Sequence, residues 1–122
     1  MKKQIPGELL KGSLKSIVLK LLAENDRMYG YEITQKVEEL TKGKIQLTYG
    51  ALYPVLHKLE KEGILITESQ NVNNRMRIYY KLTPKGKSIA VEKIEELRDY
   101  IETLKILLQP KITLQYVPVT ST

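Results

Sequence analysis

Cysteine, tryptophan and phenylalanine are absent from this chain of 122 residues, and histidine occurs once. Without cysteine the chain can form neither a disulfide nor a thiolate metal site, and a single histidine argues against a histidine-based metal centre. Long apolar runs are also missing: residues 17–22 are interrupted by Lys20, far short of the ~20 residues that a membrane helix requires. We therefore expect no cofactor and no membrane-spanning segment.

The length allows one modest hydrophobic core and is short for two. A hydrophobic content of 42% argues against a disordered chain. The N-terminal Met-Lys-Lys resembles the start of a signal peptide, but no apolar stretch follows before Lys11 and no small-residue cleavage site is present. We therefore expect a cytoplasmic protein made of one domain and an extension.

Positive charge is concentrated in one part of the chain. Residues 42–87 contain nine basic and three acidic side chains, a surplus of six that equals the net charge of +6 of the whole sequence. Outside this segment, eleven basic residues balance eleven acidic ones. Because a local field of one sign attracts molecules of the other, the sequence predicts a polyanion as the partner.

Apolar periodicity predicts two helices in the first third of the chain. In residues 9–22, leucine, isoleucine and valine recur at spacings of three and four, as on one face of an amphipathic helix. A second helix is expected over residues 29–40, where Ile33 and Val37 share a face. Residues 44–47 are too few for a helix and are predicted to form a short strand.

The segment 48–64, with the sequence TYGALYPVLHKLEKEGI, is predicted to be the helix around which the rest is organised. Thr48 suits the N-cap, and Gly63 suits the left-handed residue that ends a helix. Pro54 lies inside this helix, where its missing backbone donor ordinarily costs about 3 kcal/mol. The carbonyl left without a donor belongs to the permissive Gly50, and packing must outweigh propensity here.

The two faces of this helix differ in chemistry. One face is apolar and is expected to pack; it contains Leu52, Val55, Leu56 and Leu59. The other carries polar aromatic and basic side chains and no acid before Glu60; it contains Tyr49, Tyr53, His57, Lys58 and Lys61. Lysines attract phosphates, and phenols both pack and hydrogen-bond, so this face suits a nucleic-acid groove. A surface helix whose tyrosines cover a neighbouring element would show the same pattern, and the segment alone leaves both interpretations open.

A β-hairpin is predicted after the central helix. Residues 64–69 have the pattern of a strand, and the polar segment 70–75 contains paired asparagines that accept positive φ in a turn. The returning strand alternates strictly between its two sides. The side expected to pack contains Met76, Ile78, Tyr80 and Leu82. The side expected to face solvent or a ligand contains Arg77, Tyr79 and Lys81.

A long helix is predicted to follow, with the hydroxyl of Thr83 as its cap and Pro84 at its first position. Apolar residues then follow spacings of four and three until Pro110, namely Ala90, Ile94, Leu97, Ile101, Leu104 and Leu108. Such a helix extends about 39 Å, more than the small body before it can cover. We expect it to pack on the helix over residues 9–22 and on a second subunit; an intramolecular core helix is the alternative.

Four stretches of this sequence resemble the PadR family of bacterial transcriptional regulators. They are LKGSLKSIVLKLLA (10–23), YGYEI (29–33), GALYPVLHKLEKEGI (50–64) and RMRIYYKLTPKG (75–86). With a single long helix after the hairpin, the chain is similar to the short subclass of the family. The resemblance implies a mainly α-helical fold with a small β-hairpin: a winged helix-turn-helix followed by a long C-terminal dimerisation helix. Residues 1–83 would then be the DNA-binding domain, 84–109 the dimerisation helix and 110–122 an extended or mobile tail.

The resemblance also implies a homodimer in which each subunit places the helix 48–64 in a major groove and the hairpin against the backbone or minor groove. The residues implied to contact DNA are Tyr31, Thr48, Tyr49, Tyr53, His57, Lys58, Arg75, Arg77 and Lys81. The residues implied at the dimer interface are Leu10, Leu14, Ile17, Ile94, Leu97, Ile101, Leu104 and Leu108. The wing carries Asn74 where a glycine is usual and Ile78 where a basic residue is common, so fewer phosphate contacts are expected.

We predict a dimeric, sequence-specific DNA-binding transcriptional regulator that acts as a repressor on an inverted-repeat operator in double-stranded DNA. One alternative is a sensor for a hydrophobic small-molecule effector, bound in an apolar pocket at the dimer interface. There the wall would contain Leu97 and Ile101 with Tyr100 nearby, and the chain has no tryptophan or phenylalanine to recognise flat compounds by stacking. Another alternative is a winged-helix protein-interaction module whose basic face meets an acidic protein. His57 has no partner base or nucleophile, so no enzyme activity is expected.

Overall fold

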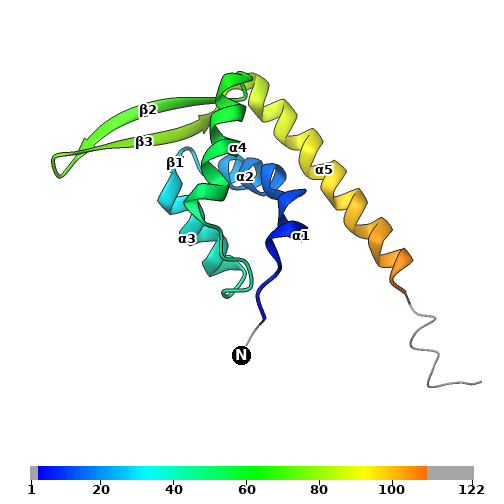
Figure 1. Ribbon diagram of the computed structural model, residues 1–122. Coiled ribbons are helices and arrows are strands. Elements are labelled where there is room, and N and C mark those ends of the chain that lie inside the picture. The colour runs from blue at the N-terminus through cyan, green and yellow to red at the C-terminus, as the bar shows by residue number, and fades with distance from the viewer. Residues whose placement is uncertain (1–2, 110–122) are drawn as a thin grey trace, which may run out of the picture.

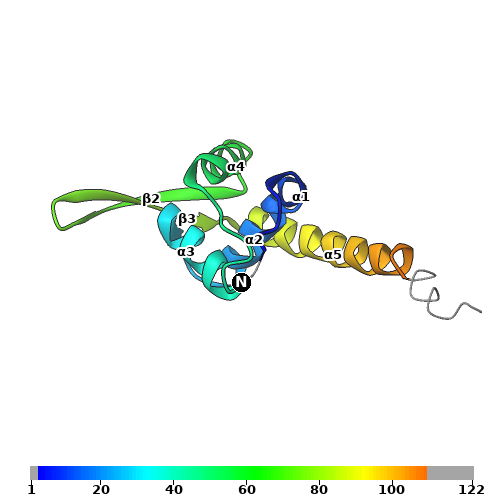
Figure 2. The same cartoon turned by 60° about the horizontal axis from the view of Figure 1, so that its bottom comes forward.

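The computed structural model describes residues 3–109 and shows a small helical body from which a hairpin and a long helix project in different directions (Figures 1 and 2). Along the chain the elements are α1 (Gly7–Lys11), α2 (Leu14–Glu24), β1 (Met28–Tyr29), α3 (Gly30–Leu40), α4 (Tyr49–Lys61), β2 (Leu65–Val72), β3 (Arg75–Leu82) and α5 (Pro84–Leu107). The strands form an antiparallel sheet in the order β1-β3-β2. This is a winged helix-turn-helix with a long C-terminal helix, so the predicted fold class is confirmed.

The hydrophobic core lies between α2, α3 and α4 and the base of the sheet. Its fully buried side chains are Val18, Leu19, Met28, Ile33, Leu52, Leu56, Leu59 and Leu65. Each such leucine or isoleucine stabilises the fold by about 1.5–3 kcal/mol relative to an exposed position. Among residues 3–109, no helix is both long and apolar enough to cross a membrane.

The helix predicted over residues 9–22 is interrupted in the structure, so this prediction is wrong in its continuity. The chain leaves the helical path at Gly12 and Ser13, which separate α1 from α2. Both the backbone N–H and the hydroxyl of Ser13 donate to the Leu10 carbonyl, at 3.0 and 3.1 Å. A serine side chain that competes for a helical carbonyl favours a local turn over the continuing ladder. Leu10 and Leu14 are nevertheless both buried, and this is why the apolar period continues across the break.

The short strand forms at Met28–Tyr29 and not at residues 44–47, where it was predicted. β1 pairs with Tyr79 and Tyr80 of β3, on the side opposite β2. The segment around Ile45 satisfies its backbone locally, because the Ile45 N–H donates to the Thr41 hydroxyl at 3.0 Å. The Lys44 carbonyl accepts from Ile5 at 2.8 Å. Tertiary pairing with β3 therefore decides which short segment becomes the strand.

The central helix α4 forms as its sequence predicts. The Thr48 hydroxyl accepts from the Ala51 N–H at 3.1 Å, and Gly63 ends the segment with φ of +78°. Pro54 lies inside the helix, and Gly50, whose carbonyl it leaves without a donor, is exposed to water. The apolar face is buried as expected, with Leu52, Leu56 and Leu59 at 0–1% exposure and Val55 packed against the core.

The hairpin turns at Asn73 and Asn74, whose φ values are 52° and 63°. Two central residues at positive φ match the right-handed twist of the strands, and asparagine tolerates this conformation well. Of the four residues predicted to pack, Tyr80 and Leu82 are buried. The prediction is wrong for Met76 and Ile78, which are 66% and 47% exposed. The outer half of the hairpin projects beyond the helices, so it has no core to cover (Figure 1).

The last helix starts against Ile64, the residue before β2, and continues past the body. The Thr83 hydroxyl accepts from the Gly86 N–H at 2.9 Å, which confirms the predicted cap. A Cβ at Gly86 would lie 2.1 Å from the Ile64 carbonyl oxygen, so glycine permits this close start. The first half of α5 packs on α2 through the buried Ala90 and the half-buried Ile94. The tail predicted over residues 110–122 lies outside the described residues.

Candidate nucleic-acid interface

An aromatic stripe runs along the exposed side of α4. Tyr49, Tyr53 and His57 lie one turn apart, with ring centroids separated by 5.5 Å and then 5.8 Å. The tyrosines are 51% and 44% exposed, and His57 is exposed as well. These side chains therefore do not cover a neighbouring element completely, and they present hydroxyl and imidazole groups outward.

The ring of Tyr49 lies directly on the start of α3. A Cβ added at Gly30 would be 2.4 Å from Cε1 of Tyr49, so the absence of a side chain at Gly30 lets the two helices meet here. Tyr31, one residue further, is 63% exposed. The first turns of α3 and α4 thus carry exposed phenols side by side.

A hollow of about 270 Å³ separates these two helix starts from the hairpin. We call it the wing hollow; it is lined by Tyr29, Gly30, Tyr31, Tyr49, Met76, Arg77, Ile78 and Tyr80. The structure thereby brings together Tyr31, Tyr49 and Arg77, which are distant in the sequence and were each predicted to contact DNA. Met76 and Ile78 were not predicted to contact a ligand; their alternation with Tyr80 and Leu82 made them indistinguishable from core residues.

The two wing arginines differ in their surroundings. Arg75 is exposed next to the turn. The guanidinium of Arg77 lies 4.1 Å from the ring centroid of Tyr29 and donates to the Tyr79 hydroxyl at 3.4 Å. The hydrogen bond that Arg77 donates to Tyr79 raises the pKa of Arg77 above its usual value, which favours the charged guanidinium. Arg77 is therefore a cation held in place by two rings.

Lys81 is paired with acids, unlike the exposed Lys58. Its Nζ lies 3.7 Å from the Glu68 carboxylate and 3.9 Å from that of Asp26. Lys81 does not line the wing hollow, and its charge is shared with these two groups. Asp26 is far away in the sequence, so no local pattern indicates this arrangement.

Arg27 is a further residue that the sequence patterns did not single out. It precedes β1, outside any helical or alternating period. Its guanidinium lies 4.1 Å from the ring centroid of Tyr79 and donates to Glu68 at 2.9 Å and to Gln70 at 2.6 Å. Arg27 thus joins the loop after α2 to both strands of the hairpin.

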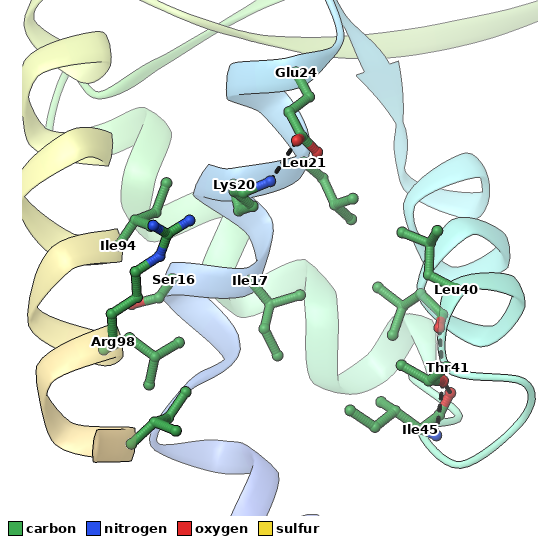
Figure 3. A pocket seen from close by; sticks show the side chains of 13 residues that line it. Ser16, Ile17, Lys20, Leu21, Glu24, Leu40, Thr41, Ile45, Ile94 and Arg98 are labelled. Carbon is green, nitrogen blue, oxygen red and sulfur yellow. Dashed lines mark hydrogen bonds and ion pairs between the residues drawn. The ribbon is translucent and has the colours of Figure 1, made fainter. Parts of the chain in front are cut away.

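The residues predicted at a dimer interface divide into three groups. Leu10 and Leu14 are buried in the core of the single chain. Ile17, Ile94, Leu97 and Ile101 line an apolar groove of about 350 Å³ between α2, the end of α3 and α5, shown in Figure 3. Beyond the groove, Leu104 is half-buried and Leu108 is 74% exposed. In Figure 3, Ile94 and Arg98 reach from α5 toward Ile17 and Lys20 of α2.

Comparison with known proteins agrees with this geometry. The transcriptional regulator PadR-like family matches residues 18–92. A transcriptional regulator of Mycobacterium tuberculosis is 33% identical over 85 residues, which cover 70% of this chain and 76% of that protein. A transcriptional regulator structure from Clostridium thermocellum superposes with a TM-score of 0.73 at 28% identity, covering 86% of this chain and 99% of that one. The structure of a PadR family transcriptional regulator from Eggerthella lenta gives a TM-score of 0.71 at 28% identity, covering 84% of this chain and 87% of that one.

Within the described residues, no three histidine, aspartate or glutamate side chains gather as a metal site requires. The family resemblance drawn from the sequence is confirmed by the match over residues 18–92. The chain belongs to the PadR-like family of transcriptional regulators, and it is a DNA-binding regulator and not an enzyme.

Proposed function

We propose that this chain works as a homodimer that represses transcription by binding an inverted-repeat operator in double-stranded DNA, in the bacterial cytoplasm. The observation that carries the proposal is the exposed stripe of Tyr49, Tyr53 and His57 beside the wing hollow. In helix-turn-helix proteins the second helix of the motif, here α4, enters the major groove. Polar groups on such a helix read base edges, while basic groups around it bind phosphates.

The proposed DNA contacts follow from exposure and position. On the helices we assign them to Tyr31, Thr48, Tyr49, Tyr53, His57 and Lys58, all of which are exposed. On the wing we assign them to Arg75 and Arg77, with Lys81 in a lesser role because Glu68 and Asp26 share its charge. The surplus of six positive charges in residues 42–87 supports the same surface.

We further propose that a second copy of the chain covers the groove along α5. Ile101, Leu107 and Leu108 are 43%, 73% and 74% exposed, and a helix with an exposed apolar seam gains free energy by burying it against a partner. The interface would comprise Ile17, Ile94, Leu97, Ile101, Leu104 and Leu108, with Leu10 and Leu14, which are buried in the single chain, contributing from α1 and α2. In this arrangement residues 1–83 bind DNA and residues 84–109 hold the dimer.

Titration of duplex DNA at several salt concentrations tests the binding mode. Operator affinity should fall steeply with salt, with a log-log slope of about −0.9 for each phosphate neutralised. Footprinting should show two half-sites whose centres are roughly 10 base pairs, or a multiple, apart. A nearly flat salt dependence would favour an acidic protein as the partner, and a footprint of one unrepeated half-site would contradict dimeric docking. A reporter whose promoter overlaps the operator should become more active when the regulator is deleted.

A second candidate function is a response to a hydrophobic small molecule. It is favoured by the apolar groove of about 350 Å³, which an effector could share with the second subunit. Titration with a hydrophobic dye, followed by operator binding in its presence, tests this. A dye that binds the protein and lowers its operator affinity would support a sensor. A dye without effect on operator affinity would indicate that the groove serves only the dimer contact.

A further inference from the structure

One side of the wing carries an alternating set of cationic and aromatic side chains. Arg27 stacks on Tyr79, and Arg77 stacks on Tyr29, each with its guanidinium carbon 4.1 Å from the ring centroid. The two rings meet edge to face, with centroids 5.4 Å apart and an interplanar angle of 79°. We call these four residues the wing brace. They come from the loop after α2, from β1 and from β3, so the brace connects the hairpin to the body.

Arg27 also contacts β2, the other strand of the hairpin. Arg27 donates to the Glu68 carboxylate at 2.9 Å and to the Gln70 side chain at 2.6 Å, both on β2. A planar guanidinium can stack on a ring and donate in its own plane at once, and an ammonium group cannot. Arg27 is therefore bound to both strands of the wing by one rigid group.

The outer part of the hairpin needs such support, because the buried side chains Leu65, Tyr80 and Leu82 fix only its base. β1 pairs with β3 only at Met28 and Tyr29, near the body. Further out, Met76 and Ile78 are exposed, and the strands continue past the helices to the turn (Figure 1). A two-stranded hairpin without a core or a third strand is marginally stable by itself. The direction of the outer wing is therefore set where the brace holds it.

We propose that Arg27 is a positioning residue for DNA binding: it fixes the direction of the wing and, through Tyr79 and Tyr29, holds Arg77 at the wing hollow. The inference rests on the proposed function, in which Arg77 binds phosphate. Arg27 acts through other residues, because its guanidinium is held by Glu68, Gln70 and the Tyr79 ring and it does not line the hollow. Loss of Arg27 frees the wing to move, and a mobile arginine pays more conformational entropy on binding than a fixed one.

A double-mutant cycle on operator binding tests this. In the wild-type background, Arg77→Ala should weaken binding roughly fivefold, the size expected for one charged contact. In an Arg27→Ala background the same change should have little further effect, because the wing is no longer held. Additive effects of the two substitutions would overturn the proposal, since they would show that Arg27 contributes independently.

Two further variants separate positioning from charge. Arg27→Lys keeps the positive charge but not the planar group, so its operator affinity should stay close to that of Arg27→Ala. Restoration of wild-type affinity by Arg27→Lys would overturn the proposal in favour of a general field effect. As a control, Lys36→Ala removes a cation that is paired with Glu39 on α3, outside the brace, and should change affinity little.

Hydrogen exchange tests the brace without DNA. In the full-length Arg27→Ala protein, backbone amides of the outer halves of β2 and β3 should exchange faster, while the helical circular dichroism is kept. If that variant does not fold, Gln70→Ala, at an exposed position, removes one contact of Arg27 and should show a smaller increase. Unchanged amide exchange rates would overturn the proposal that the wing brace fixes the hairpin. If the wild type binds no duplex DNA, the proposed function fails, and faster exchange would still support the brace itself.

Discussion

Tyr80 of β3 packs in the core, with only 5% of its surface exposed. Burial raises the pKa of its phenol to about 12, and the nearby Tyr49 and Tyr53 add to this effect. In the unfolded chain a tyrosine titrates near pH 10. Between about pH 10 and 12 the unfolded state therefore loses a proton that the folded state keeps, and the free energy of unfolding falls as pH rises. Below pH 10 this contribution is fully present.

Urea unfolding of the wild type and of Tyr80→Phe from pH 9 to 12 checks this expectation. The phenylalanine cannot titrate, so the wild type should lose on the order of 2 kcal/mol relative to it over this range. The other tyrosines and the lysines titrate in both proteins and cancel in the difference. Two curves that stay parallel would show that the phenol of Tyr80 is not held neutral by the fold.

Arg77 and Tyr49 both line the wing hollow, but we expect Arg77 to contribute to the affinity for any duplex and Tyr49 to contribute to the discrimination between sequences. Arg77→Ala should weaken binding to operator and to random duplex alike, because a wing cation meets phosphate. Tyr49→Phe keeps the ring that packs on Gly30 and removes only the hydroxyl, so it should reduce the ratio between operator and random binding. Competition titrations with both duplexes measure this. A similar loss of discrimination in both variants would mean that the wing also reads sequence or shape.

At the scale of elements, the contact between α3 and α4 places Tyr49, one of the tyrosines that we propose contact DNA. Gly30→Ala puts a methyl group where the Tyr49 ring now lies, at 2.4 Å from Cε1. Because this ring is half exposed, it can move aside, and the fold should lose no more than about 1 kcal/mol. Operator binding should fall several-fold all the same, because the displaced ring no longer presents its hydroxyl correctly.

The matched control is Gly50→Ala in the first turn of α4, where nothing lies within 4 Å of the new methyl group. This change should stabilise the helix by up to roughly 1 kcal/mol. Thermal unfolding and operator titration of both variants distinguish the cases. Equal operator affinity in wild type and Gly30→Ala would show that the position of the Tyr49 ring is unimportant for recognition.

At the scale of the whole molecule, the apolar face of α5 is exposed in the single chain, and we propose that a second copy covers it. Leu97 lines the apolar groove; in the proposed dimer an aspartate there would be buried against the second subunit without a partner, a penalty of several kcal/mol. Leu97→Asp should therefore shift the protein toward monomer, and operator binding should drop sharply because one half-site is lost. Much of the helical circular dichroism should remain, since the core lies between α2, α3 and α4.

Sedimentation and operator titration of Leu97→Asp at one protein concentration measure both effects. Ser88→Asp adds the same charge at an exposed position near the start of α5, outside the groove, and should leave the dimer intact. If the Leu97→Asp protein stays dimeric, or binds its operator as well as the wild type, the apolar face of α5 belongs to the core of one subunit and not to a dimer interface.

Features that depend on neighbours within a few residues could be predicted before the fold was known. The caps at Thr48 and Thr83 satisfy N–H groups three residues ahead, and the turn at Asn73 and Asn74 needs only residues that tolerate positive φ. The apolar periods of α3, α4 and α5 follow from the same short range, as does the concentration of charge in residues 42–87. The family and the candidate DNA contacts came from a different source, the resemblance of four sequence stretches to the PadR family.

Contacts between segments that are distant in the sequence depend on the tertiary structure. Whether residues 28–29 or 44–47 form a strand depends on pairing with β3, and the exposure of Met76 and Ile78 depends on where the helical body ends. Arg27 finds Glu68 and Gln70 at separations of 41 and 43 residues. Such contacts leave no period in the sequence, because a chain brings distant residues together through the packing of whole elements and not through local spacing.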